Sequence, residues 1–177
     1  MRHFVWIVFA SSMVSSVAFA EEPKAPPPSP EVKRTVDAFT GKWAYDVNVT
    51  MPGKPVVKGK LQFDCKKTAL GKGVACSAGG SVPGLGKMEA SFMMAYDAWS
   101  KAVHVMSVTS DDEVHDHKCT WKDDKKLDCE PLKAGMGGQE ITEDLSFTIE
   151  GKTLVLKSVT TMKDGSKMVF EGIGKKK

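Results

Sequence analysis

Arginine is almost absent from this chain of 177 residues, since 23 of its 25 basic residues are lysine and only Arg2 and Arg34 are arginine. The planar guanidinium group is the side chain best suited to clamp a phosphate or carboxylate with paired hydrogen bonds. The sequence therefore argues against such a clamp, and the lysines are expected on the solvated surface. A formal net charge of only +3 also argues against nucleic acid as a partner held by bulk charge.

Long apolar runs are lacking beyond the N-terminus, where residues 1–20 resemble a secretory signal peptide. Arg2 begins this segment, an apolar run follows, and Ala18-Phe19-Ala20 has the A-x-A form of a cleavage site. No later segment approaches the roughly 18 to 20 apolar residues of a transmembrane helix. We therefore expect no transmembrane segment and a periplasmic or secreted protein that begins at Glu21.

Proline is concentrated in residues 21–30, which hold five of the nine prolines of the chain. Such a stretch forms neither a helix nor a strand ladder, and we expect an extended linker there. Residues 31–177 are then expected to fold as one domain. The spacing of Val32, Val36 and Phe39 predicts a short helix over residues 31–39 at its start.

After Phe39 the apolar residues recur at every second position, with turn residues every eight to twelve positions. In the first such segment Trp43, Tyr45, Val47 and Val49 share one face, while polar residues take the other. This pattern predicts an all-β fold, an antiparallel up-and-down β-barrel of about 8–10 strands. The glycine-rich stretches 78–86 and 131–138 are expected to be loops.

The four cysteines fall into two pairs, each on either side of a predicted hairpin turn. Three pairings are formally possible. Cross-strand neighbours lie within the distance that a disulfide requires, which favours Cys65 with Cys76 and Cys119 with Cys129. A zinc site is the rival, but no cysteine has C-x-x-C spacing, and an exported protein meets an oxidising compartment.

Motifs of common enzymes are missing: there is no G-x-S-x-G, no H-E-x-x-H and no phosphate-binding loop leading into a helix. We therefore predict a protein that is not an enzyme, with no catalytic residues and no cofactor. His115 and His117 share one strand face with Cys119. If residues 111–112 form a two-residue loop, His104 and Met106 lie opposite them and add copper or zinc ligand types.

A metal site is nevertheless not expected from these residues. A shift of one residue in the hairpin register would move His104 to the other face, and Cys119 is expected in a disulfide. The strand histidines are then half-exposed surface groups.

The predicted inward faces carry large adaptable side chains, including several of the eight methionines that follow residue 20. Methionine repacks around varied apolar ligands, although it also fills ordinary cores. Glu143 is the one charged residue on an otherwise apolar strand face. It would orient the polar end of a ligand or pair with a lysine, unless its face is wrongly assigned. The candidate ligand-binding residues are Tyr45, Phe63, Phe92, Met94, Tyr96, Glu143 and Phe147.

The segment Gly41-Lys42-Trp43 resembles the G-x-W motif that begins the first strand of calycins, the group of lipocalins and fatty-acid-binding proteins. With Met94-Ala95-Tyr96-Asp97 and the glycine-rich middle, the chain is similar to an uncharacterised family of secreted bacterial lipocalin-like domains. The resemblance implies a ligand-holding barrel in which Trp43 packs across the closed end. It also implies a basic residue of the last strand over Trp43, which here must be a lysine such as Lys167.

The leading hypothesis is thus an exported barrel that holds a small apolar or amphipathic molecule in its interior. The alternative is a non-catalytic structural or interaction module, in which large side chains fill the barrel and the loops carry function. The sequence does not indicate a protein partner.

Overall fold

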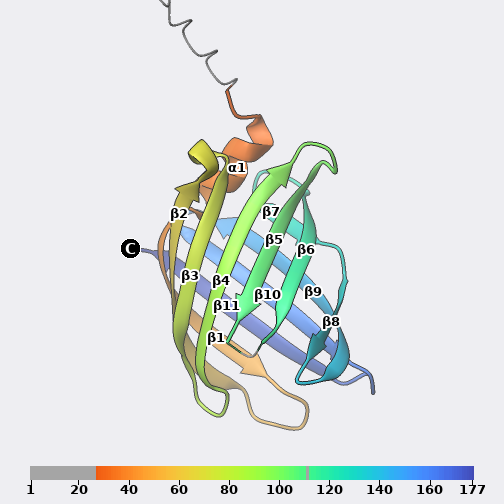
Figure 1. The fold of residues 1–177 in the computed structure, drawn as a ribbon. Helices are drawn as coiled ribbons and strands as arrows, with labels where there is room; N and C mark the ends of the chain where they lie inside the picture. Colours follow the sequence, from red (N-terminus) through yellow and green to blue (C-terminus); the bar gives the residue numbers. More distant parts are fainter. Residues whose placement is uncertain (1–26, 111) are drawn as a thin grey trace, which may run out of the picture.

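The computed structural model describes residues 27–110 and 112–177 and shows a closed antiparallel β-barrel with one short helix (Figure 1). The predicted signal peptide and most of the proline-rich segment lie outside the described residues. No helix in the described ranges is long and apolar enough to cross a membrane. The elements are α1 (Pro30–Phe39), β1 (Gly41–Thr50), β2 (Val57–Thr68), β3 (Gly73–Val82), β4 (Gly86–Asp97), β5 (Ala102–Thr109), β6 (Val114–Trp121), β7 (Lys126–Cys129), β8 (Leu132–Met136), β9 (Gln139–Glu150), β10 (Thr153–Met162) and β11 (Lys167–Lys176), with a 3-10 turn at Ala69–Gly71.

The wall of the barrel has ten places for strands. Each strand pairs with the next along the chain from β1 to β7 and from β9 to β11, and β1 closes the ring on β11. The short strands β7 and β8 both pair with β9, β7 with residues 146–148 and β8 with residues 139–143. Together, β7 and β8 therefore fill a single strand position in the wall. The predicted up-and-down barrel of about 8–10 strands is confirmed.

The alternating sequence pattern produces the inside and the outside of this wall. In β1, Trp43, Tyr45, Val47 and Val49 are buried, while the residues between them are exposed or half-buried. Because side chains on a strand point to opposite faces in turn, the apolar set lies inside and the polar set meets solvent. The core consequently lies within the barrel rather than between two sheets.

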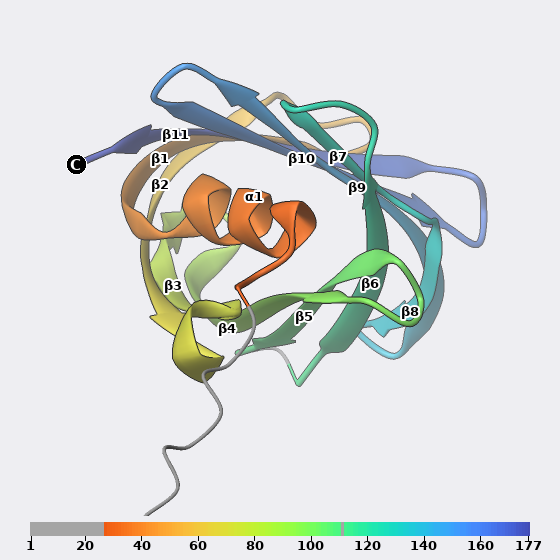
Figure 2. The ribbon, with the colours of Figure 1, turned by 90° about the horizontal axis from the view of Figure 1, so that it is seen from above.

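Helix α1 covers one end of the barrel, where it lies across the ring of strands in the view from above (Figure 2). Pro30 begins it, and Ser29 caps it by accepting a hydrogen bond from the Val32 backbone N–H at 3.3 Å. Phe39 reaches into the barrel and packs edge-on against Phe147, with 5.1 Å between ring centroids. The predicted N-terminal helix is therefore present and closes this end.

Both predicted glycine-rich loops are wrong in extent. β3 runs to Val82 and β4 starts at Gly86, so only a three-residue turn separates them. A Cβ atom at Gly80 would overlap the backbone of Lys60 and Leu61, so glycine serves here to let strands approach. In the second stretch, residues 132–136 form β8, and Gly137 and Gly138 take left-handed conformations in a tight turn.

The two local disulfides are present as predicted, Cys65 with Cys76 and Cys119 with Cys129. Each joins directly paired residues of neighbouring strands, β2 with β3 and β6 with β7. Each bridge therefore ties one hairpin of the wall together at the end that α1 covers.

The register of the β5–β6 hairpin differs from a two-residue loop by one residue. Val108 pairs with Val114, and the Thr109 N–H donates to the Glu113 carbonyl oxygen, so an odd number of residues separates the paired positions. Asp112 adopts a left-handed conformation in this loop. A shift of one residue changes which side chains of the two strands share a face. It therefore determines whether His104 lies on the same side of the wall as His115 and His117.

Candidate ligand-binding cavity

A cavity of about 340 Å³ occupies the part of the barrel away from α1. Its wall is mainly apolar, and it reaches the hairpin turns at the end opposite to the helix, where Leu85, Ser110 and Met136 line it. The apolar side chains of the deeper wall are Leu61, Phe63, Met88, Phe92, Met94, Val105, Leu145, Phe147, Leu156, Met168 and Phe170. The barrel is thus filled near α1 and hollow near its other end.

Five of the seven predicted ligand-binding residues line this cavity, namely Phe63, Phe92, Met94, Glu143 and Phe147. The rings of Phe63 and Phe92 stack at 5.4 Å between centroids and form one continuous apolar surface. The sequence reasoning missed the residues of β10 and β11, Leu156, Met168 and Phe170. Their strands alternate in the same way, so the same inspection of faces would have found them.

The two tyrosines do not line the cavity. Tyr45 is buried in the filled part of the barrel, where its ring tilts against Phe63 and lies over Gly172 and Gly174. Burial raises the pKa of Tyr45 well above its usual value, so the hydroxyl stays neutral. Tyr96 is partly buried at the packed margin of the core.

The polar part of the cavity wall centres on Glu143, which is 9% exposed. One carboxylate oxygen, Oε2, accepts hydrogen bonds from His115 Nδ1 at 2.7 Å and from His117 Nε2 at 3.1 Å. The other oxygen, Oε1, accepts from the Ser158 hydroxyl at 2.5 Å. The residues come from β6, β9 and β10, and we call His115, His117, Glu143 and Ser158 the polar cluster.

These contacts keep Glu143 ionised inside the barrel. Burial by itself would raise its pKa, but hydrogen bonds from His117 and Ser158, together with positive charge at His117 and His115, outweigh burial. Together, these interactions lower the pKa of Glu143 to about 2. The sequence correctly singled out this carboxylate, and its partners are histidines and a serine rather than a lysine.

Each histidine of the polar cluster also has a second ring nitrogen that is not used. His115 Nε2 and His117 Nδ1 are buried and have no hydrogen-bond partner among the residues that the structure describes. Glu113 Oε2 lies 3.8 Å from His115 Nε2, which is too far for a hydrogen bond. Both side chains line the cavity, but these two nitrogen atoms are themselves buried.

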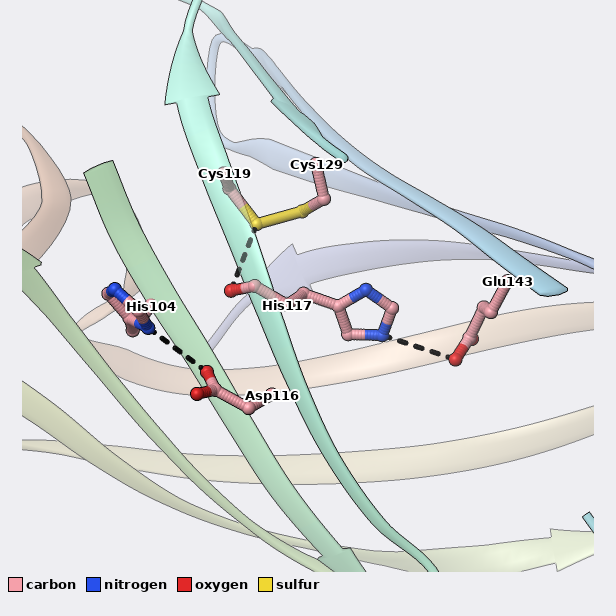
Figure 3. The surroundings of a disulfide bond; sticks show 6 residues. All are labelled: His104, Asp116, His117, Cys119, Cys129 and Glu143. Atoms are coloured by element: carbon pink, nitrogen blue, oxygen red, sulfur yellow. Dashed lines mark hydrogen bonds and ion pairs between the residues drawn. A yellow bond between two sulfur atoms is a disulfide. The ribbon is translucent and has the colours of Figure 1, made fainter. Parts of the chain in front are cut away.

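His104 and Met106 do not join the other histidines, which corrects the arrangement expected from a two-residue loop. His104 pairs with Lys118 and Met106 with Asp116, while His115 and His117 lie opposite Ser107 and Val105. His104 Nδ1 instead lies 3.1 Å from Asp116 Oδ1 on the outer side of β6, away from Glu143 (Figure 3). Cys119 is held in its disulfide and is also unavailable.

Trp43 lies near the end of the barrel that α1 covers, as the resemblance to calycins implies. Its Nε1 donates to the Phe39 carbonyl oxygen at 3.0 Å, which ties β1 to the end of α1. A lysine of the last strand covers the ring, but it is Lys176, with Nζ 5.3 Å from the ring centroid, and not Lys167. Lys176 is the direct cross-strand partner of Trp43, whereas Lys167 lies at the other end of β11.

The comparisons with known proteins place the fold and go no further. No family model matches the chain, and no curated protein matches it significantly. Among solved structures, the S-type phycobiliprotein lyase CPES from Guillardia theta has a TM-score of 0.59 at 8% identity, over 85% of this chain and 98% of that chain. At this identity the likeness shows a shared barrel fold alone.

Two further structures match with lower scores. One is a de novo designed fluorescence-activating β-barrel, with a TM-score of 0.39 at 10% identity over 81% of this chain and 98% of that chain. The other is EF1p2_mFAP2b bound to DFHBI, with a TM-score of 0.40 at 13% identity over 82% of this chain and 99% of that chain. We draw no conclusion from structures with these TM-scores.

Proposed function

We propose that this chain is an exported, lipocalin-like barrel protein that binds a small apolar or amphipathic molecule in the cavity. The observation that carries the proposal is the cavity itself, a space of about 340 Å³ with an apolar wall and one buried polar cluster. Small-molecule sites combine these two features, because apolar surface supplies affinity and a few polar groups fix orientation. The volume is at the lower end for such sites, which favours a small ligand.

The polar cluster suits the head of an amphipathic ligand. The apolar body would lie against Phe63, Phe92 and Phe147, and a hydroxyl or amide would lie against the side chains of the polar cluster, which line the cavity. The methionines of the wall, such as Met88 and Met168, can adjust to ligands of somewhat different shape.

Export is supported by two features that do not depend on the cavity. Residues 1–20 have the form of a signal peptide. All four cysteines are paired in disulfides, which persist in oxidising compartments. When the chain is expressed with its own N-terminus in a bacterium, mass measurement should find a periplasmic product that begins at Glu21. A cytoplasmic product that retains Met1 would contradict export.

A fluorescent fatty-acid probe tests the cavity. Wild-type protein should bind the probe, and Phe92→Trp should weaken binding while the denaturation midpoint changes little, because the larger ring enters vacant space. Val108→Trp is the matched control, since Val108 is 54% exposed and lies outside the cavity. Absence of probe binding by wild type, with destabilisation of Phe92→Trp by roughly 1 to 3 kcal/mol, would instead support a filled interior.

Native mass spectrometry of the protein purified from the periplasm complements the probe. A co-purifying small molecule would appear as an added mass, and its loss in Phe92→Trp but not in Val108→Trp would locate it in the cavity. If wild type and Phe92→Trp carry the same added mass, the bound molecule lies outside the cavity.

A further inference from the structure

We propose that His115, His117 and Glu143 form a binding site for a divalent transition-metal ion, with zinc as the best match. Three ligand atoms, one from each residue, lie within 4.8 Å of one another on the cavity wall. This proposal goes beyond small-molecule binding and does not depend on it. Zinc can bind without an organic ligand, and an apolar ligand can bind without zinc.

The spacing of the ligand atoms is close to that of a zinc site. Zinc bonds of about 2.0 to 2.2 Å in a tetrahedron place neighbouring ligand atoms roughly 3.4 Å apart. His115 Nδ1 and His117 Nε2 already lie 2.7 and 3.1 Å from the same oxygen of Glu143. A zinc ion would take the place of the two protons in these hydrogen bonds, and each proton would move to the other nitrogen of its ring or to solvent. The side chains would need to move apart by only a fraction of an ångström to about 1 Å.

The types of ligand favour zinc and related ions over calcium or magnesium. Imidazole nitrogens suit Zn²⁺, Cu²⁺, Co²⁺ and Ni²⁺, whereas Ca²⁺ and Mg²⁺ take oxygen ligands. Two imidazoles with one carboxylate form a set of three protein ligands that leaves a fourth position open. Because all three residues line the cavity, that position faces the interior space and not the protein core.

The second observation is the burial of histidine nitrogens without partners. His117 is 3% exposed and His115 is 7% exposed, and each has one buried ring nitrogen with no hydrogen bond within the described residues. Two hydrogen bonds to a single carboxylate oxygen leave this set of polar atoms only partly satisfied. Metal binding at His115 Nδ1 and His117 Nε2 would place the ring proton on these second nitrogens, which is the tautomer that a metal-bound imidazole adopts.

The surroundings supply the outer contacts that a zinc site needs. The Ser158 hydroxyl holds Glu143 Oε1 at 2.5 Å and leaves Oε2 for the metal. Glu113 Oε2 lies 3.8 Å from His115 Nε2, so a small movement would let this carboxylate accept a hydrogen bond from the imidazole. Carboxylate partners of this kind orient metal-bound histidines and raise their basicity.

The charge of an occupied site would favour an anionic fourth ligand. Two neutral imidazoles and one carboxylate around a divalent ion give a net charge of +1. An anionic group at the open position, such as a carboxylate, a phenolate or hydroxide, would neutralise this charge. The metal would then select ligands whose apolar body fits the cavity and whose anionic end reaches His117 and Glu143.

Direct metal titration tests the proposal. The full chain, expressed with its own N-terminus and without a histidine tag, is treated with a chelator and titrated with Zn²⁺ in a calorimeter and with Co²⁺ in a visible absorption spectrometer. We expect one Zn²⁺ per chain and intense Co²⁺ bands typical of four-coordinate geometry. His117→Ala should lower Zn²⁺ affinity by more than about 100-fold, since even outer contacts alter affinity by 10- to 100-fold.

The matched control is His104→Ala. This variant removes one histidine from the strand next to β6, but His104 lies outside the barrel beside Asp116. It should bind Zn²⁺ as wild type does. Failure of wild type to bind Zn²⁺ more tightly than His117→Ala, or an equal loss in His104→Ala, would overturn the proposal.

Two measurements keep the test valid if His117→Ala does not fold. Glu143→Gln preserves the shape of the side chain and should still weaken Zn²⁺ binding by about tenfold or more. In wild type, the ¹⁵N resonances of Nδ1 of His115 and Nε2 of His117 should move on addition of Zn²⁺, while those of His104 should not. Unchanged resonances at both buried histidines would overturn the proposal without any variant.

Discussion

His117 Nε2 and Glu143 Oε2 lie 3.1 Å apart inside the barrel, although 26 residues separate them in the chain. They stand on β6 and β9, and the contact depends on the two short strands β7 and β8 between them. Because β7 and β8 share one place in the wall, β9 lies near enough to β6 for the side chains to meet. The arrangement of β7 and β8 in the wall thus brings the residues of the polar cluster together.

Replacement of Glu143 by glutamine should destabilise the protein by about 1 to 3 kcal/mol in the absence of metal. The neutral amide loses the charge-assisted hydrogen bonds from His115 and His117, and one of the buried ring nitrogens loses an acceptor. Urea denaturation of metal-free protein measures the change. Glu130→Gln is the control, because Glu130 is exposed beside Lys118 and should change stability little. Equal midpoints for both variants would show that the polar cluster is not formed in solution.

Removal of either disulfide should lower the free energy of unfolding by about 2.5 to 3 kcal/mol. This is the loop-entropy estimate for a disulfide that closes a short loop, because the bond restricts the unfolded chain. The double variants Cys65→Ala with Cys76→Ala and Cys119→Ala with Cys129→Ala avoid a free thiol that could pair wrongly. Denaturation in urea compares them with wild type. A reducing agent should destabilise wild type and leave the quadruple variant unchanged, whereas recovery of a Cys65 to Cys129 peptide from wild type would contradict the pairing.

Most of the fold could be predicted because its determinants are local. The alternation in residues 43–49, the spacing of Val32 and Phe39, and the cysteines on paired strands each depend on a short stretch of chain. Such signals need no knowledge of distant contacts. The barrel, the short helix and the two disulfides follow from them.

The register of the β5–β6 hairpin could not be predicted with the same rules. It depends on a backbone conformation, the left-handed Asp112, which adds one residue to the loop. A glycine at such a position would signal the conformation, but an aspartate adopts it less often. A two-residue loop would have placed His104 opposite the face of His115 and His117, whereas the structure places it outside the barrel with Asp116.

The residues of the candidate site could be identified from the sequence, but their contact with one another could not, for a related reason. Glu143 was identified as a charge on an apolar face, and His115 and His117 were identified as sharing a face with Cys119. The meeting of these two faces requires contacts between β6 and β9, which no local pattern reports. A search for polar residues on every predicted inward face would have brought the three together, and Ser158 of β10 with them.

Truncation of Phe39 to alanine should destabilise the protein by about 3 to 5 kcal/mol, because its ring is 2% exposed and packs against Phe147 and Trp121. The Trp121 indole N–H, which donates to Thr35 Oγ1 at 3.1 Å, would then carry much of the contact between α1 and the barrel. Val32→Ala on the same helix is the control and should cost less, since Val32 is only partly buried. Urea denaturation decides the comparison, and equal losses would show that α1 does not cover the barrel end through Phe39.

A methyl group at residue 174 should also destabilise the barrel. Gly174 pairs directly with Tyr45 across β1 and β11, and a Cβ atom there would overlap the tyrosine ring. Because the ring is buried, it has no free direction in which to move, and Gly174→Ala should cost roughly 1 to 3 kcal/mol by overpacking. Gly135→Ala is the matched control, since its nearest neighbour would be the Gln139 carbonyl oxygen at 3.9 Å, an ordinary contact. The control should be neutral or slightly stabilising in urea denaturation, because alanine restricts the unfolded chain. A Gly174→Ala variant as stable as the control would show that Tyr45 does not pack against β11. It would also contradict a filled interior at this end of the barrel.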